Sequence, residues 1–310
     1  MKILLTGGAG FIGSHLLERL LSRGDRVTVV DDLNEYYDPA LKRANLNKAR
    51  KAGTFLFIER DIQAGLADLL DVDLVVHLAA RAGVRPSLAD PELYHAVNVG
   101  GTLRLLEDAR RANVRKLIFA SSSSVYGDHP ELPFREEAGP LDPISPYGAT
   151  KLIGEMYLRV YARLHGIHAT ALRFFTVYGP RHRPDMAIRS FAEKILRGEE
   201  ISVFGDGSTE RDYTYIDDIL QGVLAAIDRD DAFEIYNLGE SRTVPLALLI
   251  ELLEKNLGRA AKIRRLPAQP GDVRRTYASI EKARTNLGYI PQVPIEEGIR
   301  RFAAWLTASR

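Results

Sequence analysis

The sequence predicts an α/β fold, a doubly wound parallel sheet with a smaller C-terminal α/β subdomain. Up to about residue 175, short apolar runs alternate with stretches of helical periodicity. This alternation is typical of a parallel sheet with helices on both faces. Further along the chain, prolines such as Pro180, Pro184 and Pro245 break the pattern. We therefore expect a first domain of residues 1–173 and a second of residues 174–310, with an approximate boundary.

Composition and charge exclude several classes of function. The chain has 310 residues, 45% of them hydrophobic and 27% charged, as in ordinary soluble domains. Its net charge of +1 lacks the basic excess typical of nucleic-acid binding, and without cysteine there is no disulfide or thiolate site. No apolar run approaches the ~20 residues of a spanning helix, and glycine follows the first run too soon for a signal peptide. We expect a cytoplasmic protein that binds neither nucleic acid nor membrane and holds no metal.

The first three elements predict a dinucleotide site. Residues 2–6 form an apolar run that stops in glycines, and residues 15–21 have helical periodicity. Gly8, Gly10 and Gly13 have the spacing that lets a backbone approach a pyrophosphate at a helix N-terminus. The next apolar run ends at Asp31, about twenty residues further on, where a carboxylate accepts hydrogen bonds from a ribose 2′-hydroxyl and repels a 2′-phosphate. These features favour a Rossmann-type domain that binds NAD rather than NADP.

The remaining elements follow the same periodicities. In the first domain we expect strands at 55–59, 74–78, 117–120 and 169–175, and helices at 39–51, 90–112 and 145–165. In the second we expect short strands and helices near 186–198, 217–228, 246–257 and 295–308. Ligands bind beyond the carboxyl ends of parallel strands, so the segments that follow these strands should converge on one crevice. They are the glycine turn, Asp31, Asp61, Ala79-Ala80 and Ser121–Ser124.

A tyrosine and a lysine four residues apart follow the serine run. On the helix expected at 145–165, Tyr147 and Lys151 share one face. A nearby ammonium favours the phenolate of a tyrosine, and a hydroxyl with a pKa closer to neutrality suits proton transfer with a sugar hydroxyl. We interpret Ser122, Tyr147 and Lys151 as one acid–base unit. A surface pair on an amphipathic helix is the alternative, which the spacing alone leaves open.

Together these motifs resemble the extended short-chain dehydrogenase/reductase family along nearly the whole chain. The matching segments are Thr6–Gly13, His77–Ala80, Asn98–Thr102, the serine-rich strand end and Tyr147-xxx-Lys151. The resemblance implies that Tyr147 is the acid/base, that Lys151 lowers its pKa and binds the nicotinamide ribose, and that Ser122 assists at the substrate hydroxyl. It also implies NAD contacts from Gly7, Gly10, Phe11, Ile12, Gly13, Asp31, Asp32, Asp61, Ile62, Leu78, Ala79, Ala80, Asn98, Tyr147, Lys151 and Phe174.

The second domain resembles nucleotide-sugar enzymes of that family. Arg211-Asp212-Tyr213 is similar to the segment in which an arginine grips the UDP-sugar pyrophosphate, as the guanidinium fork suits phosphate oxygens. Gly271-Asp272-Val273 resembles a turn that lines the nucleotide pocket. Gln269 stands where UDP-galactose epimerases carry an arginine, which argues against naming the galactose enzyme.

The sharpest similarity is to the pattern of UDP-glucuronate 4-epimerases. It lies in Ala82–Arg85, Ser121–Gly127, Leu172–Pro180 and Arg183–Ala187. The resemblance implies that hydroxyls and the Arg183 guanidinium surround the sugar carboxylate, which needs donors and a cation when it is buried. The implied substrate contacts are Arg85, Ser122, Ser123, Ser124, Thr176, Arg183, Met186, Phe204, Arg211 and Asp272.

The implied reaction is reversible C4 epimerisation of UDP-glucuronate to UDP-galacturonate. The Tyr147 phenolate would take the C4 hydroxyl proton while hydride passes to tightly held NAD+, and the transient 4-keto sugar would turn before hydride returns to its other face. Ser123 and Ser124 stand where related dehydratases and decarboxylases carry acidic groups. Three alternatives stay open: a 4-epimerase of UDP-glucose and UDP-galactose or of a pentose, a 4,6-dehydratase or decarboxylase, and an NAD-bound regulatory protein without catalysis.

The resemblance also implies a homodimer built from the helices near 90–112 and 145–165. Apolar side chains on these helices would form a four-helix bundle with their copies, although they could equally be core. They include Leu103, Leu106, Leu152 and Met156.

Overall fold

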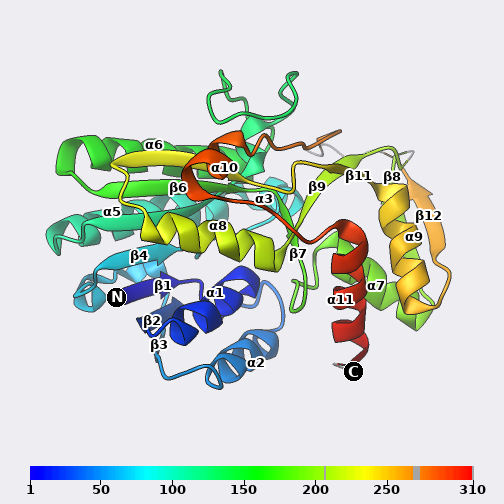
Figure 1. Cartoon of the computed structure of the whole chain (residues 1–310), viewed down its shortest axis with the longest axis horizontal. Helices are drawn as coiled ribbons and strands as arrows, with labels where there is room; N and C mark the ends of the chain where they lie inside the picture. Colours follow the sequence, from blue (N-terminus) through cyan, green and yellow to red (C-terminus); the bar gives the residue numbers. More distant parts are fainter. Residues whose placement is uncertain (206, 268–272, 309–310) are drawn as a thin grey trace. The chain divides into compact units, whose positions relative to one another are not determined.

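The structure is a computed structural model that describes residues 1–205, 207–267 and 273–308 (Figure 1). The chain divides into two compact units. Unit 1 contains residues 1–127, 141–173 and 223–236, and unit 2 contains residues 128–140, 174–222 and 237–310. One division falls at the expected residue 174, but the chain also passes between the units elsewhere. The assignment of NAD binding to residues 1–173 and of substrate binding to residues 174–310 stays a prediction.

Unit 1 is built on a seven-stranded sheet in the order β10-β6-β5-β4-β1-β2-β3. Its strands are β1 (Lys2–Thr6), β2 (Arg26–Asp31), β3 (Leu56–Glu59), β4 (Leu74–His77), β5 (Lys116–Ser122), β6 (His168–Phe174) and β10 (Phe233–Leu238). β1 pairs in parallel with β2 and β4, β2 with β3, and β4 with β5, so the predicted parallel sheet is confirmed. The chain moves outward from β1 to β3 and returns to β4, which places the topological switch point between β1 and β4.

The edge strand β10 comes from the region that the sequence analysis gave to the second domain. α8 (Ile216–Asp228) leads back to the sheet and spans a division between the units, and β10 then lies beside β6. A parallel crossover of this kind needs a connecting helix, and α8 supplies it. The domain boundary at residue 174, inferred from the prolines, did not predict that the chain returns to the first sheet.

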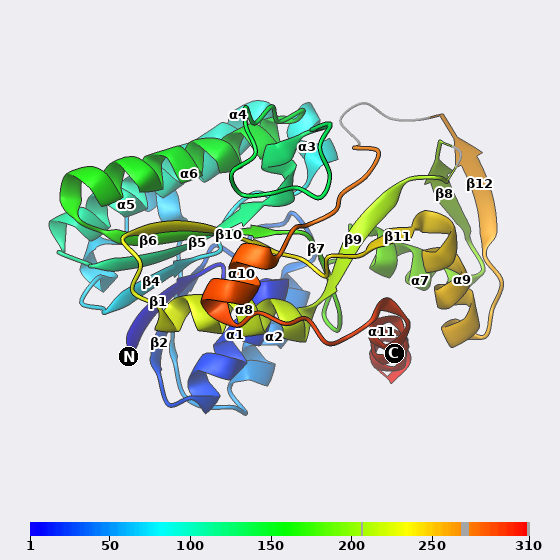
Figure 2. The same cartoon turned by 45° about the horizontal axis from the view of Figure 1, so that its top comes forward.

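Two groups of helices cover the sheet of unit 1 (Figures 1 and 2). α1 (Phe11–Ser22) and α2 (Pro39–Ala49) lie on one face, while α5 (Thr102–Arg111) and α6 (Pro146–His165) lie side by side on the other. Buried side chains three or four residues apart on α5 and α6, such as Leu105, Ala109, Leu158 and Tyr161, join the apolar core with Phe119 of β5. The expected helices at 39–51 and 145–165 are confirmed within a few residues.

The single helix expected at residues 90–112 has a different form. α4 (Pro91–Tyr94) runs into a π-helix (η3, His95–Gly101), and α5 follows. Gly100 and Gly101 weaken the α-helical preference of this stretch. A Cβ at Gly101 would lie 2.6 Å from Ile62 Cδ1, so the glycine allows a close approach of the chain after β3. π turns often occur at functional sites.

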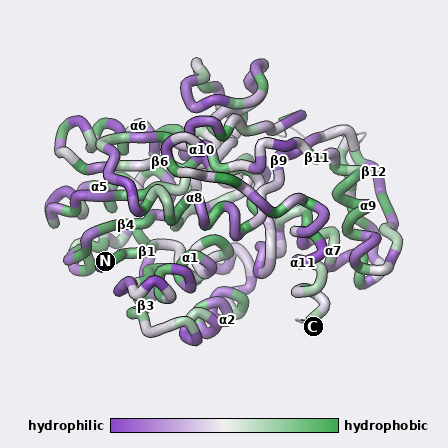
Figure 3. The backbone as a smooth tube through the Cα atoms, in the orientation of Figure 1, coloured by the Kyte–Doolittle hydropathy of each residue, from purple (hydrophilic) through white to green (hydrophobic). Residues whose placement is uncertain are grey.

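Unit 2 contains two small sheets. β7 (Thr176–Tyr178), β9 (Glu210–Tyr215) and β11 (Thr243–Pro245) form one in the order β11-β9-β7, and β8 (Glu200–Phe204) pairs in parallel with β12 (Lys262–Leu266). Its helices are α7 (Ala187–Arg197), α9 (Leu246–Leu257), α10 (Glu281–Leu287) and α11 (Ile295–Ala308), of which only α10 was not expected. α9 is hydrophobic over much of its length (Figure 3) and buries Leu249, Ile250 and Leu253. No helix among the described residues has the length and apolar character needed to cross a membrane.

Candidate active site

The glycine turn between β1 and α1 forms a backbone cradle. Gly7 has φ +73°, and a Cβ there would lie 2.7 Å from Ala79 N, while a Cβ at Gly13 would lie 2.2 Å from Gly7 O. Side chains are therefore excluded at both positions. Gly10 precedes α1 and supplies no side-chain cap to the first turn, so the peptide N–H groups that begin α1 are suited to an anion such as a pyrophosphate. Phe11 and Ile12 are the first residues of this turn.

Hydrogen bonds tie the end of β1 to the end of β4 at the switch point. Thr6 Oγ1 accepts from Ala79 N at 3.2 Å and lies 2.7 Å from His77 Nδ1. His77 Nε2 lies 3.0 Å from Thr102 Oγ1, and burial lowers the pKa of His77 to about 3, so this imidazole is neutral. The segment Leu78–Ala80, expected to contact NAD, is thereby held beside the glycine turn.

Asp31 ends β2 beside the same turn. One carboxylate oxygen accepts from Ala9 N at 3.1 Å and the other from Leu33 N at 3.0 Å. Burial raises the pKa of Asp31, while Lys42 acts in the opposite direction. These bonds join the end of β2 to the glycine turn, which is the geometry expected of a ribose-binding acid. Asp32, which follows, accepts from Asn34 N at 3.2 Å.

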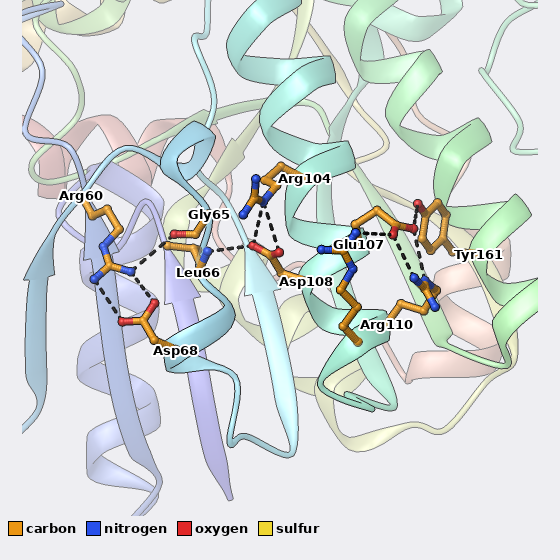
Figure 4. A network of polar contacts seen from close by, with 10 residues as sticks. Arg60, Gly65, Leu66, Asp68, Arg104, Glu107, Asp108, Arg110 and Tyr161 are labelled. Atoms are coloured by element: carbon orange, nitrogen blue, oxygen red, sulfur yellow. Dashed lines mark hydrogen bonds and ion pairs between the residues drawn. The ribbon is translucent and has the colours of Figure 1, made fainter.

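Asp61 and Ile62, which were expected to contact NAD, lie after β3. Asp61 caps a short 3₁₀ helix (η1, Ile62–Ala64) and accepts from Gln63 N at 2.8 Å, while the Ile62 side chain is buried against Gly101. A few residues later Leu66 N donates to the buried carboxylate of Asp108 on α5 at 2.8 Å (Figure 4). α5 and the π-helix therefore fix the segment that carries Asp61 and Ile62.

Asn98 of the π-helix connects the end of β4 with α6. Its Oδ1 accepts from Arg81 N at 2.7 Å, and its Nδ2 donates to Arg81 O at 2.9 Å and to Thr150 Oγ1 at 3.1 Å. The side chain thus binds protein groups on both sides. Its predicted contact with NAD stays a proposal, whereas its role in joining these two segments is a feature the sequence did not indicate.

The proposed catalytic tyrosine and lysine lie at the start of α6, and Ser145 caps that helix by accepting from Gly148 N at 3.1 Å. Tyr147 N donates to Ser87 Oγ at 3.1 Å, and the Tyr147 ring makes an edge contact with Tyr94. Lys151 Nζ donates to Ala120 O at 2.7 Å. Burial lowers the pKa of Lys151 to about 7, although the nearby Glu155 carboxylate raises it in part.

The serine run lies against the first turn of α6. Ser122 caps a 3₁₀ helix (η4, Ser123–Tyr126), accepts from Ser124 N and donates to Ser124 Oγ, each at 3.1 Å. A Cβ at Gly148 would lie 2.4 Å from Ser124 O, so the glycine beside Tyr147 lets the two segments touch. Ser122, Tyr147 and Lys151 are thus brought to one end of the sheet, and Ser123 and Ser124 remain partly exposed there.

The other predicted substrate residues are distributed over several elements. Arg85 is exposed on α3 (Val84–Ala89) of unit 1, and Thr176 begins β7 in unit 2. Phe174, which was expected to contact NAD, is buried at the end of β6. Met186 precedes α7, and Phe204 ends β8. Asp272, with Gln269 and Gly271, lies outside the described residues.

Two predicted arginines of unit 2 already have protein acceptors. Arg183 donates to both carboxylate oxygens of Asp185, at 3.0 and 2.6 Å. Arg211 in β9 donates to Glu210 O at 2.9 Å. The Arg183 pair means that a substrate carboxylate would have to share this guanidinium with Asp185 or displace it.

A buried acid next to Arg211 was missed by the sequence analysis. The carboxylate of Asp212 accepts from Glu240 N at 2.7 Å and from Ser241 N and Ala278 N at 3.1 Å. Burial raises the pKa of Asp212 to about 6. Asp212 thus holds β9, which carries Arg211, against two other segments of unit 2. In the sequence, the one indication of this role is that Asp212 stands on a strand, where alternate side chains face inward.

Among the described residues, no group of three or more His, Asp or Glu is arranged to hold a metal ion.

Comparison with known proteins assigns the family. The family model described as "NAD dependent epimerase/dehydratase family" matches residues 3–239. The chain belongs to this family. It is 42% identical over 309 residues to a UDP-glucuronate 4-epimerase from Thermodesulfobacterium geofontis, covering 97% of this chain and 95% of that protein. As an extended short-chain dehydrogenase/reductase, it has the fold and the class of enzyme that its motifs predicted.

Two solved structures are similar over the whole chain. A UDP-glucuronic acid 4-epimerase from Bacillus cereus, in complex with UDP-glucuronic acid and NAD, is 38% identical with a TM-score of 0.95 and full coverage of both chains. A UDP-glucose 4-epimerase with UDP-glucose from Thermotoga maritima is 36% identical with a TM-score of 0.91, covering 100% of this chain and 99% of that one. Both the preferred substrate and the main alternative are thus represented among the relatives.

Proposed function

We propose that this protein interconverts UDP-glucuronate and UDP-galacturonate by reversible epimerisation at C4, with bound NAD. The observation that carries the proposal is the full-length similarity to the Bacillus cereus enzyme, whose complex holds UDP-glucuronic acid and NAD. The local geometry agrees, because Ser122, Tyr147 and Lys151 lie on adjoining segments at one end of the sheet.

The residues of unit 1 fit NAD. The uncapped start of α1 suits the pyrophosphate, Asp31 suits the adenosine ribose, and the segment at Asp61 and Ile62 suits the adenine. Lys151, with its ammonium beside the end of β5, would bind the nicotinamide ribose. When bound, NAD supplies reversible oxidation at C4 of the sugar, with no net redox change over a turnover.

Side chains of the protein transfer the proton. The Tyr147 phenolate takes the proton from the C4 hydroxyl of the sugar and returns it afterwards, while Ser122 orients the C4 hydroxyl. The cationic Lys151 stabilises the phenolate electrostatically. Arg211 holds the UDP pyrophosphate, which keeps the 4-keto sugar bound while the hexose turns.

Recognition of the uronate carboxylate is assigned to Ser123, Ser124, Thr176 and Arg183. Hydroxyls and a guanidinium can offset the desolvation of a carboxylate. A carboxylate fixed in this way would be restrained from leaving as CO₂ from the β-keto acid intermediate. Ser123 and Ser124 also offer no acid at the strand end, in keeping with epimerisation rather than dehydration or decarboxylation.

A neutral-sugar 4-epimerase is the second candidate, favoured by one observation. Arg183 donates two hydrogen bonds to Asp185, so its charge is already balanced without a uronate. The test is to incubate the purified protein with UDP-glucuronate and, separately, with UDP-glucose and to identify products by NMR. UDP-galacturonate formed from the first, with little or no turnover of the second, supports the proposal; equal or faster turnover of UDP-glucose contradicts it.

The same proposal includes a cytoplasmic homodimer built through α5 and α6. Met156, Val160 and Leu164 are spaced four apart on α6 and are 61%, 45% and 70% exposed. An apolar stripe of this kind suits a helix–helix interface, whereas Leu106, also considered for the interface, is buried in the core. Light scattering should give the mass of a dimer, and a monomeric mass would exclude it. Cell fractionation tests the location.

A further inference from the structure

Four buried side chains form a hydrogen-bonded group behind the proposed catalytic residues. Arg173 on β6 donates from Nε and Nη2 to the two carboxylate oxygens of Glu155 on α6, at 2.9 and 2.8 Å. Ser121 Oγ donates to the same carboxylate at 2.5 Å. Arg173 Nη1 donates to Tyr126 OH at 2.8 Å, and the guanidinium lies 4.7 Å from the centre of that ring. We call these four residues the buried arginine network.

Each end of the network adjoins a residue of the proposed acid–base unit. Ser121 directly precedes Ser122, and Tyr126 ends the 3₁₀ helix that Ser122 caps. Glu155 lies one helical turn after Lys151 on α6. Close to this turn a Cβ at Gly154 would lie 2.5 Å from the Phe119 ring, so α6 sits directly on β5. The network therefore joins the end of β5, η4 and α6 to β6.

Stability alone is a weak reason for such a group. Arg173 and Glu155 are only 2% and 3% exposed, and a buried ion pair loses much of its Coulomb energy to desolvation. Apolar side chains of similar volume often stabilise a core as well or better. Apolar packing does not fix how the segments are oriented relative to one another. The two-point pair of Arg173 with Glu155, together with its two hydroxyl partners, does fix that orientation.

The network also bears on the charge of Lys151. The groups that face its ammonium are the Ala120 carbonyl and Phe119 ring from β5, the neutral His77 from β4, and Glu155 from its own helix. Of these, Glu155 carries the negative charge that keeps the pKa of Lys151 from falling further under burial. Arg173 in turn donates to both oxygens of Glu155, and these bonds hold that carboxylate in place on α6.

We propose that the buried arginine network is a positioning device for catalysis, which holds Ser122 in place and keeps Lys151 cationic beside Tyr147. The inference rests on the proposed epimerase function and deepens it. Glu155 and Arg173 act through their neighbours and touch neither substrate nor cofactor. The sharpest probe is the double variant Glu155→Gln/Arg173→Met, which removes both charges and so leaves no buried charge unpaired.

The kinetic test compares this double variant and Tyr126→Phe with the wild type on whichever UDP-sugar the wild type turns over. A matched control is Tyr161→Phe, which also removes a tyrosine hydroxyl that is hydrogen-bonded to a charged group; Tyr161 donates to Glu107 and lies further along α6 (Figure 4). We expect folded protein with NAD retained, KM within about threefold, kcat of the double variant down tenfold or more, and kcat of Tyr126→Phe down severalfold. The alkaline limb of the kcat profile should move to lower pH in the double variant, and Tyr161→Phe should match the wild type.

Unchanged kcat and pH profile in the double variant, or equal losses in Tyr126→Phe and Tyr161→Phe, would overturn the inference. A second measurement needs no turnover and separates this inference from the proposed function. NMR titration of the Lys151 amino group in the NAD-loaded protein should show a pKa lower by about one unit in Glu155→Gln, as expected for the loss of a nearby opposite charge. An unchanged pKa would refute the role of Glu155 whatever the substrate is.

Discussion

Lys151 donates a hydrogen bond from its buried ammonium to the carbonyl oxygen of Ala120 at 2.7 Å. This contact ties the first turns of α6 to the end of β5, where the serine run begins. The lysine therefore has a fixed direction before any ligand binds, which limits the reorganisation needed when the phenolate forms.

Replacement of Lys151 by methionine should change both activity and the pH dependence of stability. We expect kcat to fall by about a hundredfold or more, as for loss of a group that activates the acid/base. Burial lowers the pKa of Lys151 from 10.5 to about 7, so between these values the unfolded chain binds more protons than the folded one. The free energy of unfolding therefore rises with pH in this window, by on the order of 3 kcal/mol from pH 7 to pH 9.5 for this group.

Urea unfolding of NAD-free protein at both pH values measures that rise. Lys151→Met should lack it, while Lys51→Met, at an exposed lysine, should keep it. If the wild type and Lys151→Met had the same pH dependence, the amino group would not be desolvated as the structure indicates.

Tyr147→Phe should abolish epimerisation while the protein keeps its NAD. Loss of a general acid/base typically reduces the rate by about 10²–10⁴-fold. Product formation by NMR and NAD content after denaturation measure the two effects. Tyr157→Phe, on the same helix, serves as the control. Full activity in Tyr147→Phe would show that another group moves the proton.

Arg183→Ala should weaken the uronate far more than a neutral sugar. A hydrogen bond to a charged group contributes about 1.5–3 kcal/mol, so KM for UDP-glucuronate should rise tenfold or more. Asp185→Asn should have the opposite effect, because it removes the carboxylate that now accepts from Arg183. Arg197→Ala is a matched control, since Arg197 makes the same two-residue fork with Glu199. Equal changes in KM for both sugars would show that Arg183 does not bind the uronate carboxylate.

Asp212→Asn should destabilise the protein. Each Asp212 oxygen accepts from backbone N–H groups, and the amide nitrogen of Asn would face donors that it cannot satisfy. A buried unsatisfied donor costs about 1–3 kcal/mol, so we expect a loss of about 2–4 kcal/mol at pH 8 in denaturant unfolding. Asp230→Asn, at an exposed acid that accepts from His168, should lose much less. A loss no larger than in that control would contradict the role of Asp212.

The sequence predicted the location of those parts of the candidate site whose geometry is local. Each of these parts depends on only one or two neighbouring elements. They are the glycine turn, Asp31 and the pair Tyr147 and Lys151, which the structure places at one end of the sheet. Most strand and helix positions in the first 175 residues followed from periodicity in the same way, but the π-helix at His95–Gly101 did not.

What the sequence did not predict depends on partners far apart in the chain. Asp212 binds the backbone of residues 240, 241 and 278, and Asn98 binds that of Arg81, which periodicity cannot foresee. The pairing of Glu155 with Arg173 requires the register of α6 against β6. The return of β10 to the first sheet was missed because prolines suggested a single boundary.

Epimerisation by bound NAD is tested with UDP-glucuronate that carries deuterium at C4, with no NAD added to the NAD-loaded protein. We expect UDP-galacturonate that retains the deuterium at C4, because the same hydrogen leaves one face of the sugar and returns to the other within the site. Product in which C4 carries hydrogen from solvent, or the absence of UDP-galacturonate altogether, would contradict this expectation.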